Sequence, residues 1–173
     1  ASGMAAVTAA ILARVKGGQK IIAQTNIYSA TYNFLCDLAP QYGIEVIWVD
    51  GKAPEQWEAA FQAHPDAVLA YAETPANPTL SIVDIQTTAE IAHSSGAWLM
   101  VDNTFATPYC QRPLSAGADV VVHSTTKYLS GHGQVIGGAV ISSHIDYVKE
   151  PLYQMFKILG GCPSPFDSWL ANI

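Results

Sequence analysis

The sequence predicts an α/β domain with a mostly parallel sheet, and three observations support this fold class. Short apolar runs alternate with amphipathic helical segments along the chain. Glycine or proline stands at several of the boundaries between these segments. Half of the 173 residues are hydrophobic and only 13% are charged, so the chain can bury one sizeable core. Alternating strands and helices are typical of α/β domains with parallel strands.

The predicted elements follow one another in chain order. The first helix is rich in good helix formers, begins after the Ser-Gly pair at 2–3 and stops at the Gly-Gly pair at 17–18. Gly43 precedes a strand, and Pro54 suits the first turn of a helix. The predicted helices are residues 4–16, 28–38, 54–61, 84–95 and 144–159. The predicted strands are residues 20–24, 44–49, 67–72, 97–102, 118–123 and 137–142.

Charge and cysteine usage exclude several functions. Eight Lys and Arg residues stand against 14 Asp and Glu residues, a net charge of −6 without any basic cluster, so nucleic acid is not an expected partner. The three cysteines are widely spaced and form no CxxC pair, which favours a reducing cytoplasm and no zinc site. The five histidines show no paired metal-ligand spacing, so we expect no metal.

The ends of the sequence indicate neither a leader nor a complete protein. The apolar run 4–15 is short and carries Arg14, which predicts an amphipathic helix and not a signal peptide or membrane span. Residues 1–4 run straight into helical sequence without an initiator methionine or a preceding strand. Residues 168–173 end in an apolar stretch without a cap signal. We therefore expect a fragment of a longer protein.

An acid and a lysine follow two consecutive predicted strands. Asp102 closes the run 97–102, and Lys127 lies twenty-five residues later, just past the next strand. A pyridoxal 5′-phosphate (PLP) enzyme needs such a pair, because the lysine forms a Schiff base and the carboxylate keeps the pyridine nitrogen protonated. The spacing alone leaves other roles open, since a strand-ending Asp is also typical of caps and metal ligands.

Asp102, Lys127 and Asn77 all fall at the carboxyl ends of predicted strands, where ligands bind in such sheets, and other residues offer further contacts. The helix start at 2–4 offers backbone N–H groups to a phosphate, and Ser124 and Thr126 offer hydroxyl groups, although each is also typical of ordinary capping. Tyr28 suits stacking on a pyridine ring or plain core packing. Asn77 suits a hydrogen bond to the cofactor's phenolic oxygen or turn chemistry. We expect packing or hydrogen-bonding roles for His123 and His132, since neither has a carboxylate beside it in the sequence.

Seven short motifs together resemble the Cys/Met-metabolism PLP enzymes. This family includes cystathionine γ-synthase, cystathionine γ-lyase, methionine γ-lyase and the homoserine-ester sulfhydrylases. The motifs occur in order over nearly the whole chain: 2–6 (SGMAA), 73–80 (ETPANPTL), 83–85 (VDI), 101–108 (VDNTFATP), 111–114 (QRPL), 117–119 (GAD) and 123–128 (HSTTKY). The resemblance implies the three-layer large PLP-binding domain of fold type I, with a mostly parallel seven-stranded sheet, over residues 1–173.

The resemblance also implies a role for each candidate residue. Lys127 is the expected Schiff-base lysine, and Asp102 the expected partner of the pyridine nitrogen. The expected phosphate ligands are Gly3 and Met4 through their backbone, with Ser124 and Thr126. The remaining expected contacts are Tyr28 stacked on the ring, Asn77 near the phenolic oxygen and Thr104 on the other side of the ring.

The expected activity is elimination or replacement at the γ (or β) carbon of sulfur amino acids or O-acyl-homoserine, by a homo-oligomer that is a tetramer of two catalytic dimers. The family completes each site with a Tyr-x-Arg pair of a neighbouring subunit and an arginine of a C-terminal domain, and both regions lie outside this chain. Methionine γ-lyases carry a cysteine where this sequence has Ala30, which counts against a strict methionine γ-lyase.

Two alternatives remain beside the enzyme. In the first alternative, the chain is a cofactor-binding core without turnover of its own, which lacks the N-terminal arm and the C-terminal small domain. A nicotinamide-binding dehydrogenase is disfavoured, because no G-x-G-x-x-G follows any predicted strand.

Overall fold

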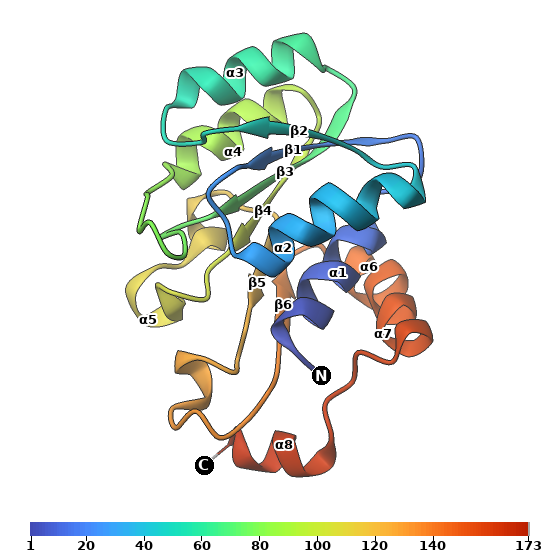
Figure 1. Cartoon of the computed structure of the whole chain (residues 1–173), viewed down its shortest axis with the longest axis vertical. Coiled ribbons are helices and arrows are strands. Elements are labelled where there is room, and N and C mark those ends of the chain that lie inside the picture. The colour runs from blue at the N-terminus through green and yellow to red at the C-terminus, as the bar shows by residue number, and fades with distance from the viewer. Residues whose placement is uncertain (173) are drawn as a thin grey trace.

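The structure, a computed structural model, describes residues 1–172 and shows an α/β domain built on one sheet (Figure 1). Ile173, the last residue of the predicted domain, lies outside the described residues. The strand order is β2-β1-β3-β4-β5-β6, with the first five strands parallel and β6 antiparallel to β5. The strands are β1 Lys20–Gln24, β2 Glu45–Val49, β3 Ala67–Glu73, β4 Trp98–Asp102, β5 Val120–His123 and β6 Ala139–Ser142.

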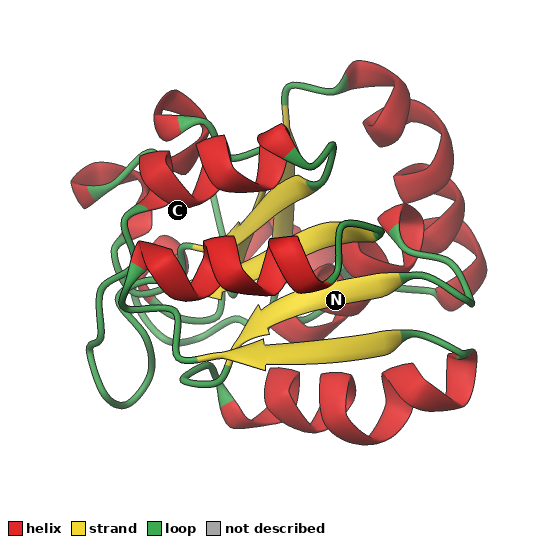
Figure 2. Cartoon of the chain, turned by 90° about the horizontal axis from the view of Figure 1, so that it is seen from above, coloured by secondary structure: helices red, strands yellow, loops and turns green. Residues whose placement is uncertain are grey.

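Helices cover both faces of the sheet and make three layers (Figure 2). Helices α3 and α4 pack on one face, and α1 packs on the other face together with α2 and the α6–α7 segment (Figure 1). The helices are α1 Gly3–Arg14, α2 Ser29–Asn33, α3 Pro54–Ala63, α4 Ile85–Ser94, α5 Thr107–Cys110, α6 Ile145–Tyr147, α7 Tyr153–Leu159 and α8 Pro165–Leu170.

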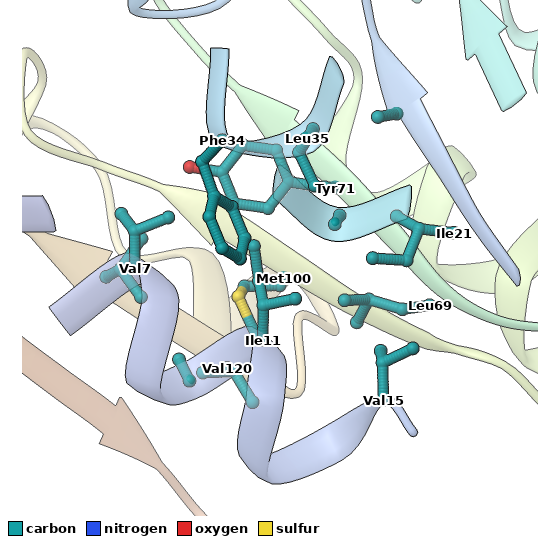
Figure 3. Close-up of a cluster of buried hydrophobic side chains, with 14 of the residues drawn as sticks. Val7, Ile11, Val15, Ile21, Phe34, Leu35, Leu69, Tyr71, Met100 and Val120 are labelled. Carbon is teal, nitrogen blue, oxygen red and sulfur yellow. The ribbon is translucent and has the colours of Figure 1, made fainter. Parts of the chain in front are cut away.

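Two hydrophobic clusters, one on each face, hold the layers together. Successive residues of a strand point to opposite faces, so Leu69 and Tyr71 join the α1 side while Ala70 and Ala72 join the α3–α4 side. Figure 3 shows the α1-side cluster, where Tyr71 lies among side chains from α1 and from the segment after α2. Burial on both faces explains why the four inner strands β1, β3, β4 and β5 are almost continuous apolar runs and not alternating ones.

The predicted fold class and all six predicted strands are confirmed. The seventh strand, implied by the resemblance alone, has no counterpart among residues 1–172. The predicted helix 28–38 is α-helical only over Ser29–Asn33 and continues as a π-helical turn over Phe34–Leu38. The predicted helix 144–159 likewise passes through a π-helical turn at Val148–Leu152, which contains Pro151. A proline has no N–H to donate, so a helix widens locally to accommodate it.

Two short helices, α5 and α8, were not predicted. Helix α8 nonetheless carries a start signal, since Ser164 Oγ accepts the N–H of Asp167 at 3.0 Å and Pro165 occupies the first turn. Across residues 1–172, the helices all fall short of the length and apolar character that a bilayer crossing requires.

Candidate active site

Segments that follow four of the strands meet around one cavity of about 280 Å³ near the start of α1. All nine residues that the sequence indicated line this cavity: Gly3, Met4, Tyr28, Asn77, Asp102, Thr104, Ser124, Thr126 and Lys127. They come from five separate stretches of chain, so the fold alone brings them together. Sequence reasoning assigned no role to Glu73, Phe105 or Ile136, which also line the cavity.

The N-terminus of α1 forms a cradle for an anion. Ser2 caps this 12-residue helix, and its Oγ accepts the N–H of Ala5 at 3.0 Å. The N–H groups of Gly3 and Met4 belong to the first turn, where a helix offers no carbonyl partner and the helix dipole is positive. A Cβ on Gly3 would lie 2.6 Å from Ser124 Cβ, so only glycine lets the Ser124 loop approach this helix start. Backbone N–H groups and a serine hydroxyl thus converge, as phosphate binding requires.

Thr126 lines the cavity, but its hydroxyl is already engaged. Its Oγ1 accepts the N–H of Gly137 at 2.9 Å and donates to the carbonyl of Gly137 at 3.2 Å. Donation to a phosphate requires the hydroxyl hydrogen to turn away from the Gly137 carbonyl, so the expected phosphate contact of Thr126 stays a prediction. The observed pair instead fixes the lysine loop against the segment that leads into β6.

Asp102 lies at the end of β4, 7% exposed, with its side chain oriented by Thr104. Asp102 Oδ1 accepts both the backbone N–H of Thr104 at 2.9 Å and its hydroxyl at 2.6 Å. Burial raises the pKa of Asp102, while the two bonds from Thr104 oppose the rise. A cation in the cavity would favour the ionised carboxylate. The Asp102 carboxylate therefore suits a protonated ring nitrogen, which is the partner expected for it from the sequence.

Thr104 has a role that the sequence did not indicate. Its Oγ1 donates to Asp102 and also accepts the backbone N–H of Ser124 at 2.8 Å. This hydroxyl therefore joins the end of β4 to the loop after β5. Its expected contact with the ring remains a prediction, whereas its link between Asp102 and the anion cradle is a feature of the structure.

Glu73 is the main residue that sequence reasoning missed. Its carboxylate accepts the backbone N–H of Tyr28 at 2.6 Å and that of Asn77 at 2.7 Å. The side chain is 5% exposed, and burial, followed by the nearby charge of Asp102, raises the pKa of Glu73 to about 7. Glu73 belongs to the motif ETPANPTL, but a strand-ending acid before a proline-rich turn carries no distinctive signal by itself.

Lys127 and two apolar residues complete the cavity. Lys127 lies in the loop after β5, and its side chain is exposed where it borders the cavity. Phe105 and Ile136 add an apolar wall beside it. His123 lines a different hollow, and burial lowers its pKa. His123 is buried away from the cavity and His132 is exposed in a loop, and their expected packing or hydrogen-bonding roles stay predictions.

The chemistry of these groups matches PLP. The cofactor carries a phosphate, a ring nitrogen that needs an acidic partner and an aldehyde that reacts with amines, and the cavity presents a group for each. The cradle at Gly3, where an added Cβ would collide with Ser124, is the specific observation that fits the phosphate. The arrangement defines an α/β domain with a cavity that fits PLP.

Comparison with known proteins gives the family. A model of the Cys/Met metabolism PLP-dependent enzymes matches residues 1–172, and the chain belongs to this family. It is 46% identical to the L-methionine gamma-lyase of Porphyromonas gingivalis over 173 residues, which cover 99% of the chain and 43% of that protein. It is 40% identical to a probable cystathionine gamma-synthase of Herpetosiphon aurantiacus, covering 98% of the chain and 52% of that protein.

Solved structures agree with this assignment. The crystal structure of metB from Corynebacterium glutamicum superimposes with a TM-score of 0.93 at 39% identity, over 98% of this chain and 43% of that one. The chain therefore spans about half the length, or less, of the relatives it matches.

Proposed function

We propose that the protein is a PLP-dependent enzyme that eliminates or replaces the substituent on the γ (or β) carbon of sulfur amino acids or O-acyl-homoserines. The main observation in support is that Lys127, Asp102 and the Gly3 cradle line one cavity. Relatives named as γ-lyase, γ-synthase and sulfhydrylase support this class of substrate. These relatives are named for different reactions and share this domain, so the proposal is the class of reaction common to them.

The residues of the cavity divide the chemistry among them. When bound, PLP supplies an electron sink for the charge left at the substrate's Cα. Lys127 Nζ is the amine that holds the cofactor and then takes the Cα proton. Asp102 Oδ2 holds the proton on the ring nitrogen, because Oδ1 is occupied by Thr104. The N–H groups of Gly3 and Met4, with the Ser124 hydroxyl, bind the phosphate.

Tyr28 and Asn77 orient the ring in this proposal. Tyr28 is 41% exposed at the cavity, which leaves its aromatic face free to stack on a flat cationic ring. Asn77 borders the cavity from the turn after β3, where its side-chain amide can donate to the phenolic oxygen.

An alternative is a cofactor-binding core that has no turnover by itself. The observation in its favour is that the chain spans only 43% of the Porphyromonas gingivalis relative. Groups that bind the substrate carboxylate then come from residues beyond this chain. We further propose that the complete protein is a homo-oligomer in a reducing cytoplasm, which suits the exposed free cysteines Cys36, Cys110 and Cys162.

The test is an assay of the complete protein with cystathionine, methionine and O-acyl-homoserines, with the products identified by mass spectrometry. Turnover of at least one of these substrates is expected, and Lys127→Ala should lower it by several orders of magnitude, because both the cofactor link and the base are removed. Borohydride reduction followed by peptide mapping should place the pyridoxyl group on Lys127. A pyridoxyl group on another lysine, or full activity of Lys127→Ala, contradicts the proposal.

A further inference from the structure

We propose that Glu73 is a positioning residue for the cofactor, because its carboxylate joins the backbones of Tyr28 and Asn77 and so fixes the two side chains that orient the ring. This inference rests on the proposed function, since it requires PLP in the cavity. Glu73 touches neither the reacting atoms nor the phosphate cradle in this assignment, and it acts only through its two partners.

The geometry makes one carboxylate the link between two distant segments. Oε2 accepts the N–H of Tyr28 at 2.6 Å, and Oε1 accepts the N–H of Asn77 at 2.7 Å. Tyr28 follows β1 and Asn77 follows β3, so these two segments are joined by a side chain at the point where both border the cavity. Two N–H donors aimed at two oxygens require an acceptor at both positions, and an ionised carboxyl group accepts both bonds more strongly than a neutral one.

Glu73 is itself rigidly held. Its backbone N–H donates to Gln24 Oε1 at 3.0 Å, and Gln24 is fully buried. Glu73 is the register partner of Asp102 in the sheet. The residue proposed to position Tyr28 and Asn77 therefore lies beside the residue assigned to the ring nitrogen. Because the backbone of Glu73 is fixed in the sheet, a displacement of its side chain moves Tyr28 and Asn77 and leaves the strand in place.

The surroundings of Glu73 favour a role that is coupled to a cationic ring in the cavity over a role in folding alone. Within residues 1–172 no lysine, arginine or histidine forms an ion pair with it. The other titratable groups that face it are Asp102 and the buried hydroxyl of Tyr71, while Lys127 borders the same cavity. Burying an unpaired carboxylate beside another acid is costly, and a cationic ring in the cavity would offset that cost.

The sign of the pH dependence follows from these groups. Burial and the charge of Asp102 raise the pKa of Glu73 to about 7, although the two N–H bonds oppose the rise. Above this pH both oxygens accept. As the pH falls through about 7, Glu73 takes up a proton, and the protonated oxygen becomes a hydroxyl that accepts an N–H only weakly. The hold on Tyr28 and Asn77 is thus complete above that pH and weakened below it.

The test uses the complete protein, with PLP titrated at pH 6 and pH 8 and with visible circular dichroism of the bound cofactor. In Glu73→Gln an amide NH₂ group replaces one of the two carboxylate oxygens. This NH₂ group then faces a backbone N–H, and two donors cannot form a hydrogen bond. PLP should therefore bind on the order of tenfold more weakly at pH 8. The dichroism band should differ from wild type even at saturating PLP. The loss of PLP affinity from pH 8 to pH 6 should be several-fold larger in wild type than in Glu73→Gln. Glu73→Asp, which keeps the charge with a shorter reach, should lie between the two.

Tyr147→Phe serves as the matched control. It also removes one buried side-chain bond to the backbone, from Tyr147 Oη to the carbonyl of Ala10 at 2.8 Å, at a residue that does not border the cavity. It should lower thermal stability without changing the dichroism band or the pH dependence of PLP affinity. If both Glu73 variants keep wild-type PLP affinity and dichroism, the inference about Glu73 is overturned while the proposed function stands. Wild-type protein that binds no PLP overturns both.

Discussion

Two acidic residues at neighbouring strand ends have different roles because of the donors around them. Thr104 occupies Oδ1 of Asp102 with two bonds, and no other described residue donates to Oδ2. Both oxygens of Glu73 accept a backbone N–H. Oδ2 of Asp102 can thus accept a hydrogen bond from a ligand, whereas both oxygens of Glu73 already accept hydrogen bonds from the protein.

The first prediction at this scale concerns Asp102→Asn. The amide cannot hold the proton on the ring nitrogen, so the electron sink is lost while the cavity keeps its shape. PLP should remain bound, and turnover should fall by several orders of magnitude. Absorbance of the bound cofactor measures PLP binding, and steady-state kinetics on the same preparation measure turnover. Near-normal activity would show that Asp102 serves only as a turn cap.

At the scale of elements, the strands could be predicted because burial on both faces makes them short apolar runs. The same rule does not reveal which residues meet at their ends. The sequence places Asn77, Asp102 and Lys127 at one edge because each ends or follows a predicted strand. Glu73 was missed because its role depends on the backbone N–H of Tyr28, which lies 45 positions away in the sequence and is seen only in the folded chain.

The departures from prediction in the helices have local causes. The π-helical turn Phe34–Leu38 contains neither glycine nor proline, so composition alone predicted a continuous helix. Helix α5 is four residues long, which is too short for any periodic pattern. The phosphate contact of Thr126 stays a prediction, and the bond of its hydroxyl to Gly137, eleven positions further along the chain, is a feature that the sequence did not indicate.

The prediction at the scale of elements concerns the contact between the start of α1 and the Ser124 loop. In Gly3→Ala the new methyl group would lie 2.6 Å from Ser124 Cβ and 3.1 Å from its Cα, so the loop backbone must move. PLP should bind at least tenfold more weakly, because the cradle loses its geometry. Ser2→Ala is the control: it removes the cap at a cost of about 1 kcal/mol in stability but adds no atoms. Equal PLP affinity in Gly3→Ala and wild type would contradict the assigned phosphate site.

At the scale of the whole molecule, apolar side chains remain uncovered in several places. Tyr109 is 93% exposed beside the cavity-forming loops, and Ile158, Phe166 and Trp169 are exposed on α7 and α8 at 70%, 65% and 59%. Exposed apolar surface of this kind marks contacts with other chains or domains. Since the chain spans only about half the length of its relatives, further residues of the protein or a second copy are the expected partners.

The last prediction follows from this surface. The complete protein should be a homo-oligomer, most simply a tetramer of two catalytic dimers, with part of each active site supplied by a neighbour. The 173 residues alone should bind PLP weakly and show little or no C–S lyase activity, because the phosphate then has only the α1 cradle and the Ser124 loop as ligands. Light scattering and PLP titration of both proteins measure the two properties. A monomeric 173-residue protein with full activity would contradict both the oligomer and the need for residues beyond this chain.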